Sequence, residues 1–128
     1  AMAAFLLEEG FEGIRALRDL SWNKFIDLEP TKGESCFYFN AASGVFATSS
    51  FSSFCANSGG YFSRTATIQN ACRDEAGDII GSTASMATCS SGSIDTGTKK
   101  ITIKIVWGPT YQYSQVADMY LADLYPNN

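Results

Sequence analysis

The residue types that most often carry out catalysis are scarce in this chain. The sequence contains no histidine, so it has neither a Ser-His-Asp triad nor a Cys-His pair. The stretch Ser21-Trp22-Asn23-Lys24 matches the Ser-x-x-Lys pattern of penicillin-recognising acyl enzymes, but the companion motifs of those enzymes are absent. We therefore expect no catalytic residues, and the protein is predicted not to be an enzyme.

Metal-binding patterns are equally weak. Asp74, Glu75 and Asp78 offer oxygen ligands for a hard cation, but they lack the spacing and the distal Glu of an EF-hand loop. The usual ligand spacing for tetrahedral zinc is also absent, since there is no histidine and no Cys-x-x-Cys pair. We interpret the three carboxylates as a solvated turn between strands and expect neither a metal ion nor a cofactor.

Basic residues could contact phosphate groups in one segment, at Lys99, Lys100 and Lys104. No glycine-rich phosphate loop or nucleic-acid-binding motif accompanies them, so a charged outer face of a strand is the preferred interpretation. The formal net charge of the whole chain is -4. This charge predicts no overall attraction to nucleic acid or to an anionic bilayer.

Aromatic residues are frequent between residues 37 and 61. The faces of aromatic rings suit sugar ligands, but packing in the core accounts for most aromatic side chains. The candidates for exposed binding positions are those in or beside a Ser- and Gly-rich loop expected from Ser49 to Gly60, namely Phe51, Phe54 and Tyr61.

Four widely spaced cysteines favour disulfide bonds and hence an exported protein. They allow three pairings. The sequential pairing, Cys36 with Cys55 and Cys72 with Cys89, closes loops of about 20 residues, each stabilising by roughly 3 kcal/mol in the chain-entropy model. Sequence does not exclude the other two pairings.

The first element that positions these residues is an amphipathic helix predicted from near Ala3 to about Leu20. Apolar residues recur at steps of three and four, at Leu7, Phe11, Ile14 and Leu17. Another side carries a charged row formed by Glu8, Glu12, Arg15 and Asp19. No capping residue precedes the apolar run, so we expect this helix to be the second half of a longer one. Gly10 and Gly13 each cost roughly 1 kcal/mol against Ala, which suggests close approach by another backbone.

The rest of the chain alternates strand and turn signals. Strands are expected at residues 36–40, 44–50, 61–74, from 79, and at 99–108, with a loop from Gly81 to Thr98. In the clearest of them Ile101, Ile103, Ile105 and Trp107 face one way, and Lys100, Thr102 and Lys104 face the other. Residues 115–125 fit either a helix or a strand, and a strand paired with residues 101–107 needs fewer assumptions.

These elements predict a single domain of the α+β class, with an N-terminal amphipathic helix packed on an antiparallel β-sheet. Residues 1–28 would form the helix and a short following turn. Residues 29–128 would form a globular β-sheet head with variable loops.

Residues 6–22, LLEEGFEGIRALRDLSW, resemble the part of bacterial type IV pilin-like proteins just beyond their hydrophobic segment. The run from Tyr61 to Thr67, the ITIKIVW strand and the closing segment around VADMYLADLY also resemble the C-terminal sheet of these proteins. The resemblance is patchy but covers both ends of the chain, and the order of the elements is more specific than any one motif.

The resemblance implies a structural subunit of a type IV pilus, a pilin or minor pilin that supports adhesion, twitching motility or DNA uptake. Such a subunit is anchored in the inner or cytoplasmic membrane by an upstream segment before assembly. It then polymerises through its helix with like or different pilins into an extracellular, cell-surface filament. The candidate contacts between subunits are the charged helix residues Glu8, Glu9, Glu12, Arg15 and Arg18.

Two alternatives stay open on the sequence alone. A type II secretion pseudopilin would share the helix but push substrates instead of adhering. A non-enzymatic adhesin module would recognise a host surface, a glycan or a host protein through its loops.

Overall fold

The computed structural model describes residues 2–20, 33–50, 55, 61–84, 88–108, 110 and 112–123. It contains one helix, α1 (Met2–Leu20), within this part of the chain. The strands are β1 (Glu34–Asn40), β2 (Val45–Ser50), β3 (Phe62–Arg73), β4 (Ile79–Thr83), β5 (Ser93–Trp107) and β6 (Tyr113–Ala122). The short turn expected after the helix, up to residue 28, lies outside the described residues.

The expected α+β class is wrong, because strand accounts for 57% of the described residues and the fold is a mainly antiparallel sheet with one helix on it. Part of the difference lies in the segment expected to be a loop from Gly81 to Thr98. There β4 continues to Thr83 and β5 begins at Ser93. These Ser-, Thr- and Gly-rich residues form strands because both segments pair with the end of β3, a long-range interaction that local composition does not reveal.

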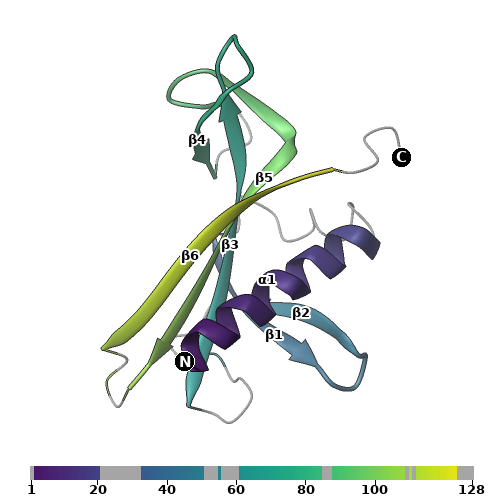
Figure 1. The fold of residues 1–128 in the computed structure, drawn as a ribbon, viewed down its shortest axis with the longest axis vertical. Coiled ribbons are helices and arrows are strands. Elements are labelled where there is room, and N and C mark those ends of the chain that lie inside the picture. The colour runs from purple at the N-terminus through teal and green to yellow at the C-terminus, as the bar shows by residue number, and fades with distance from the viewer. Residues whose placement is uncertain are drawn as a thin grey trace.

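The sheet has the strand order β2-β1-β3-β5-β6, and every neighbouring pair is antiparallel. β4 pairs with the end of β3, off this path. Figure 1 shows that this end of β3, together with β4 and the start of β5, extends well beyond the helix. The segment that fitted either a helix or a strand is strand β6, as preferred.

α1 crosses one face of the sheet, and the core lies between them (Figure 1). The predicted apolar stripe is confirmed, because Leu7, Phe11 and Ile14 are buried and Leu17 is partly buried. Opposite them lie the three isoleucines predicted to share one side of β5, all fully buried: Ile101, Ile103 and Ile105.

The two helix glycines do lie at close contacts, but not with another backbone as expected. A Cβ at Gly13 would lie 2.6 Å from the ring of Phe46, and one at Gly10 would lie 3.3 Å from side-chain atoms of Arg64 and Ile103. Glycine at these positions lets side chains of the sheet reach the helix surface.

Candidate functional site

Arg64 is the most unusual residue in the core. It lies on β3 and faces the helix, on the same side of the strand as Ala66 and Ile68. Its exposed fraction is 0%, and it is the largest of the fully buried side chains. A buried arginine is costly unless its charge and its N–H groups find partners.

The partners of Arg64 come from three other elements. Its Nη1 donates to the backbone oxygen of Leu6 at 3.1 Å and to Oε1 of Glu9 at 2.8 Å, both on α1. Its Nε donates to the backbone oxygen of Phe37 on β1 at 3.2 Å. The guanidinium carbon also lies 5.6 Å and 5.3 Å from the ring centres of Phe37 and Phe46. One side chain therefore joins the helix, β1, β2 and β3.

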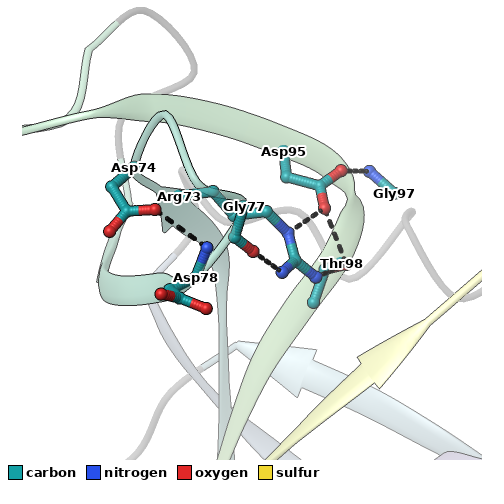
Figure 2. Close-up of polar contacts among 7 residues, drawn as sticks. All are labelled: Arg73, Asp74, Gly77, Asp78, Asp95, Gly97 and Thr98. Carbon is teal, nitrogen blue, oxygen red and sulfur yellow. Dashed lines mark hydrogen bonds and ion pairs between the residues drawn. The ribbon is translucent and has the colours of Figure 1, made fainter.

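A second polar cluster lies at the far end of the sheet, around Arg73 (Figure 2). Arg73 Nε donates to Oδ2 of Asp95 at 2.7 Å, and Nη2 donates to Oγ1 of Thr98 at 3.2 Å. Its Nη1 donates to the backbone oxygen of Gly77 at 2.6 Å. Gly77 has a φ of 87°, which glycine adopts readily, and this turns the chain between β3 and β4. The cluster ties the β3–β4 turn to the start of β5.

The Arg73 guanidinium holds the pKa of Asp95 below its ordinary value of 3.8. Partial burial of Asp95 acts in the opposite direction, and hydrogen bonds from Thr98 and from the Gly97 amide add to the lowering. Asp95 is thus held as a carboxylate, the form that suits an ion-pair partner better than a proton donor.

Asp74 and Asp78 form the turn beside this cluster. The amide of Asp78 donates to Oδ1 of Asp74 at 2.9 Å (Figure 2). The amide of Asp74 donates to the backbone oxygen of Asp78 at 3.0 Å. Over the part of the chain that the structure describes, no group of three or more His, Cys, Asp or Glu side chains is placed to hold a metal ion.

Lys99 does not lie on an outer strand face as expected. It is 3% exposed and lies opposite Asn70 in the β3–β5 register, and its Nζ donates to Oδ1 of Asn70. Burial lowers the pKa of Lys99 below 10.5, while the negative charge of Asp95 acts in the opposite direction. The predicted outer positions of Lys100 and Lys104 are confirmed, since both alternate with the buried isoleucines.

Both disulfide bonds follow the sequential pairing, which was the preferred one of the three. Cys36 is bonded to Cys55, and Cys72 is bonded to Cys89. Cys36 and Cys72 belong to β1 and β3, whereas Cys55 and Cys89 lie outside the described strands.

The five charged helix residues proposed as subunit contacts are in different environments. Glu9 forms an ion pair with Arg64 of the same domain. Glu12 and Arg15 form an ion pair at 2.6 Å, and Arg15 also donates to the sulfur of Met119 at 3.6 Å. Arg18 pairs with Asp19 at 3.2 Å. Glu8 is exposed. Glu8 and Glu12 thus remain the most accessible of the predicted contacts.

Of the three proposed binding aromatics, Phe51 and Phe54 lie outside the described residues. Tyr61 is 58% exposed, and it begins a continuous row of aromatic rings at one end of the sheet. Ring centres are 5.0 Å apart from Tyr61 to Phe62, 5.7 Å from Phe62 to Trp107, and 5.8 Å from Trp107 to Tyr113. We call these four residues the aromatic row.

Sequence reasoning missed the burial of Arg64 and of Lys99, although the strand alternation contains a signal for both. Arg64 occupies the apolar-face position between Phe62 and Ala66, and Lys99 precedes Ile101 by two residues. A charged residue that lies on the same strand face as a series of apolar residues is a candidate for burial. Such a residue needs a hydrogen-bonding or oppositely charged partner in the core.

Among the described residues there is no helix that is both long enough and apolar enough to cross a membrane. Comparison with protein-family models, with curated protein sequences and with solved structures found no match to this chain.

Proposed function

We propose that this chain is a structural subunit of a type IV pilus that polymerises through α1. The observation that carries the proposal is the division of α1 into two sides. The inner side is fastened to the sheet by the apolar core and by Arg64. The opposite side is exposed, and we use the name outer side of α1 for its exposed residues Met2, Phe5, Glu8 and Glu12.

The outer side of α1 has the composition of a contact surface. Phe5 is 59% exposed and Met2 is 54% exposed, on successive turns of one helix. Large apolar side chains beside charged ones are typical of surfaces that bind another protein. In a filament built by stacking helices, the carboxylates of Glu8 and Glu12 would fix the stagger of a neighbouring copy.

The similarity of residues 6–22 to pilin-like proteins supports the same proposal. The two disulfide bonds fit a domain exported to an oxidising environment. We accordingly propose an extracellular location in a cell-surface filament, with the subunit held at the membrane before assembly.

The test must distinguish the effect of losing a contact between subunits from the effect of losing the ion pair within α1. In the full-length protein, expressed in the organism that encodes it, Glu12→Arg reverses one charge and breaks the pair with Arg15. The double variant Glu12→Arg/Arg15→Glu restores an opposite-charge pair within the helix but leaves the reversed charge pattern on the helix surface. The readouts are the amount of filament sheared from the cells and the urea midpoint of the isolated domain.

We expect the double variant to unfold at the wild-type urea concentration and still to assemble few or no filaments. Phe5→Ser should also reduce filament yield, because it removes exposed apolar area without touching the core. Wild-type yield from both the double variant and Phe5→Ser would refute assembly through this surface. Asp118→Asn, an exposed change on β6, is the control that should leave the yield unchanged.

A second candidate function, glycan binding by an adhesin module, is favoured by the aromatic row. Tyr61 and Tyr113 are more than half exposed at its two ends. Rigid, partly exposed rings in a row offer the apolar faces on which sugar rings stack. Binding of the isolated domain to a glycan array, lost in both Tyr61→Ala and Tyr113→Ala and kept in Tyr120→Ala on β6, would support this function. No binding above background to any glycan would exclude it.

A further inference from the structure

Lys99 and Asn70 form an unusually close pair in the interior. They lie directly opposite each other on β5 and β3, and Nζ of Lys99 is 2.5 Å from Oδ1 of Asn70. An amine nitrogen hydrogen-bonded to a carbonyl oxygen normally lies about 2.7–3.2 Å away. The amine is therefore in direct contact with the side-chain amide group, whose carbon is one bond from that oxygen.

The surroundings of this pair favour a reactive amine. Asn70 is 0% exposed and Lys99 is 3% exposed, so bulk water is largely kept away from both groups. Burial lowers the pKa of Lys99, which increases the fraction of neutral, nucleophilic amine at a given pH. Asp95 is the charged group that acts on this amine from the same strand.

The register of the sheet explains how the two side chains meet. The β3–β5 pairing runs regularly up to Asn70 and Lys99 and then shifts, so that the next residue of β3, Ala71, pairs with Asp95. An irregularity of this kind changes the direction of the adjacent side chains. The pair is therefore held at the last regular position before the irregularity.

We propose that Lys99 and Asn70 become joined by an intramolecular amide bond between their side chains. The lone pair of the neutral Lys99 Nζ attacks Cγ of Asn70, a carbon–nitrogen bond forms, and the bond from Cγ to the original amide nitrogen breaks. The proton that the amine sheds passes to the departing nitrogen, which leaves as ammonia. The reaction requires no oxidant, reductant or cofactor.

Such a bond would permanently link β3 to β5 in the middle of the sheet. On β3, Asn70 lies two residues before Cys72, which forms the disulfide bond with Cys89. Unlike that disulfide bond, the amide bond would survive a reducing agent. The proposal is independent of the proposed function, because it concerns only the covalent structure of this domain.

Mass spectrometry of the intact, reduced wild-type domain tests the proposal directly. We expect a mass lower than that of the sequence by one molecule of ammonia, about 17 Da. After reduction, alkylation and trypsin digestion, peptides Thr65–Arg73 and Asp74–Lys100 should stay joined, with the branch between Asn70 and Lys99.

Four variants sharpen the test. Lys99→Arg and Asn70→Ala should both have the full mass of their sequences. Asn70→Asp should give the same branched peptide by loss of water, about 18 Da, because its carboxyl group can form the identical bond. Lys100→Arg, a change at the neighbouring residue, which pairs with Asp118 on the other face of β5, should keep the loss of ammonia.

The proposal is overturned if the wild-type domain has the full mass of its sequence. It is also overturned if the loss of ammonia is found within peptide Thr65–Arg73 alone, since an asparagine can lose ammonia by cyclising onto its own backbone. These readouts come from the wild-type protein, so they do not depend on whether a variant folds.

Discussion

Arg64 shows how one charged residue can hold two layers of a domain together. Its guanidinium replaces the water it loses with two backbone oxygens, the carboxylate of Glu9 and the faces of two aromatic rings. The backbone oxygens are fixed in direction, so the side chain also determines where α1 can lie on the sheet. Removing it leaves buried acceptors without a donor, and this is costly.

We predict that Arg64→Leu lowers the free energy of unfolding by about 3 kcal/mol, because buried oxygens lose their donor and Glu9 loses its charge partner. Glu9→Gln should cost only about 1 kcal/mol, since the amide oxygen still accepts the Arg64 hydrogen bond. Urea denaturation of the isolated domain measures both values.

Arg15→Leu is the matched control for Arg64→Leu, because the ion pair of Arg15 with Glu12 is exposed. Its cost should stay below about 1 kcal/mol. Equal losses of stability from the Arg15 and Arg64 variants would contradict the role assigned to Arg64.

Asp95 links stability to acid pH. Its pKa is lowered on folding, so below pH 3.8 the folded state holds fewer protons on this group than the unfolded state does. The stability that Asp95 contributes is therefore fully present above that pH and is lost as the pH falls through the lowered pKa.

We predict that Asp95→Asn flattens the acid limb of a plot of unfolding free energy against pH, in the region below the ordinary pKa of 3.8. Arg73→Met should flatten the same limb, because Arg73 is the main cause of the lowered pKa. Urea unfolding at a series of pH values measures the slope. An unchanged slope in both variants would show that this ion pair does not contribute to acid stability.

At the scale of elements, α1 depends on a close fit with β2. Gly13 is a poor helix former, yet its missing side chain leaves room for the ring of Phe46. The same ring stacks on Phe37, with ring centres 5.0 Å apart, and lies beside Arg64. At this position, the packing of α1 against β2 therefore outweighs the poor helix propensity of glycine.

We predict that Gly13→Ala destabilises the domain by about 1 kcal/mol, although alanine favours a helix. The gain in helix propensity is about 1 kcal/mol, whereas overpacking against an aromatic ring costs about 1–3 kcal/mol. In a Phe46→Leu background the same substitution should be neutral or stabilising, because the obstructing ring is gone. Thermal or urea unfolding of the four proteins gives this coupling, and additive effects would contradict the packing explanation.

At the scale of the whole molecule, the two disulfide bonds connect Cys55 to β1 and Cys89 to β3. The cysteines of each pair are separated by 19 and 17 residues, respectively. Closing loops of this length restricts the unfolded chain more than the folded one.

We predict that replacing either pair with serine lowers the free energy of unfolding by about 3 kcal/mol. Urea denaturation of each variant, compared with the wild type in the absence and presence of a reductant, measures the effect. The reductant should lower the wild-type midpoint, and it should have no effect once both pairs are replaced. A wild-type midpoint that does not respond to complete reduction would contradict this contribution.

Much of the fold could be predicted from local pattern. The spacing of Leu7, Phe11 and Ile14 indicates which side of α1 is buried, because helix periodicity depends only on neighbours in the chain. The alternation around Ile103 does the same for β5. The extents of β4 and of the start of β5 could not be predicted, since their polar residues become strand only by pairing with β3.

The candidate sites were less predictable than the elements. The sequence gives the position of Arg64 in a strand, but its burial depends on Leu6, Glu9 and Phe37, which lie 58, 55 and 27 residues away. Lys99 was expected in water and lies against Asn70 instead, 29 residues away. Charged residues are buried in a core only where distant partners compensate for the lost hydration. The spacing of residues along the sequence does not reveal which partners those are.

The sequence by itself determined the amphipathic helix, the apolar face of the longest strand and the preference for sequential disulfide pairing, because each follows from spacing along the chain. The tertiary structure alone decided the β-rich class, the buried positions of Arg64 and Lys99, and the exposed outer side of α1. These properties depend on which distant segments meet, and that is settled by the free energy of the whole chain and not by any one stretch of it.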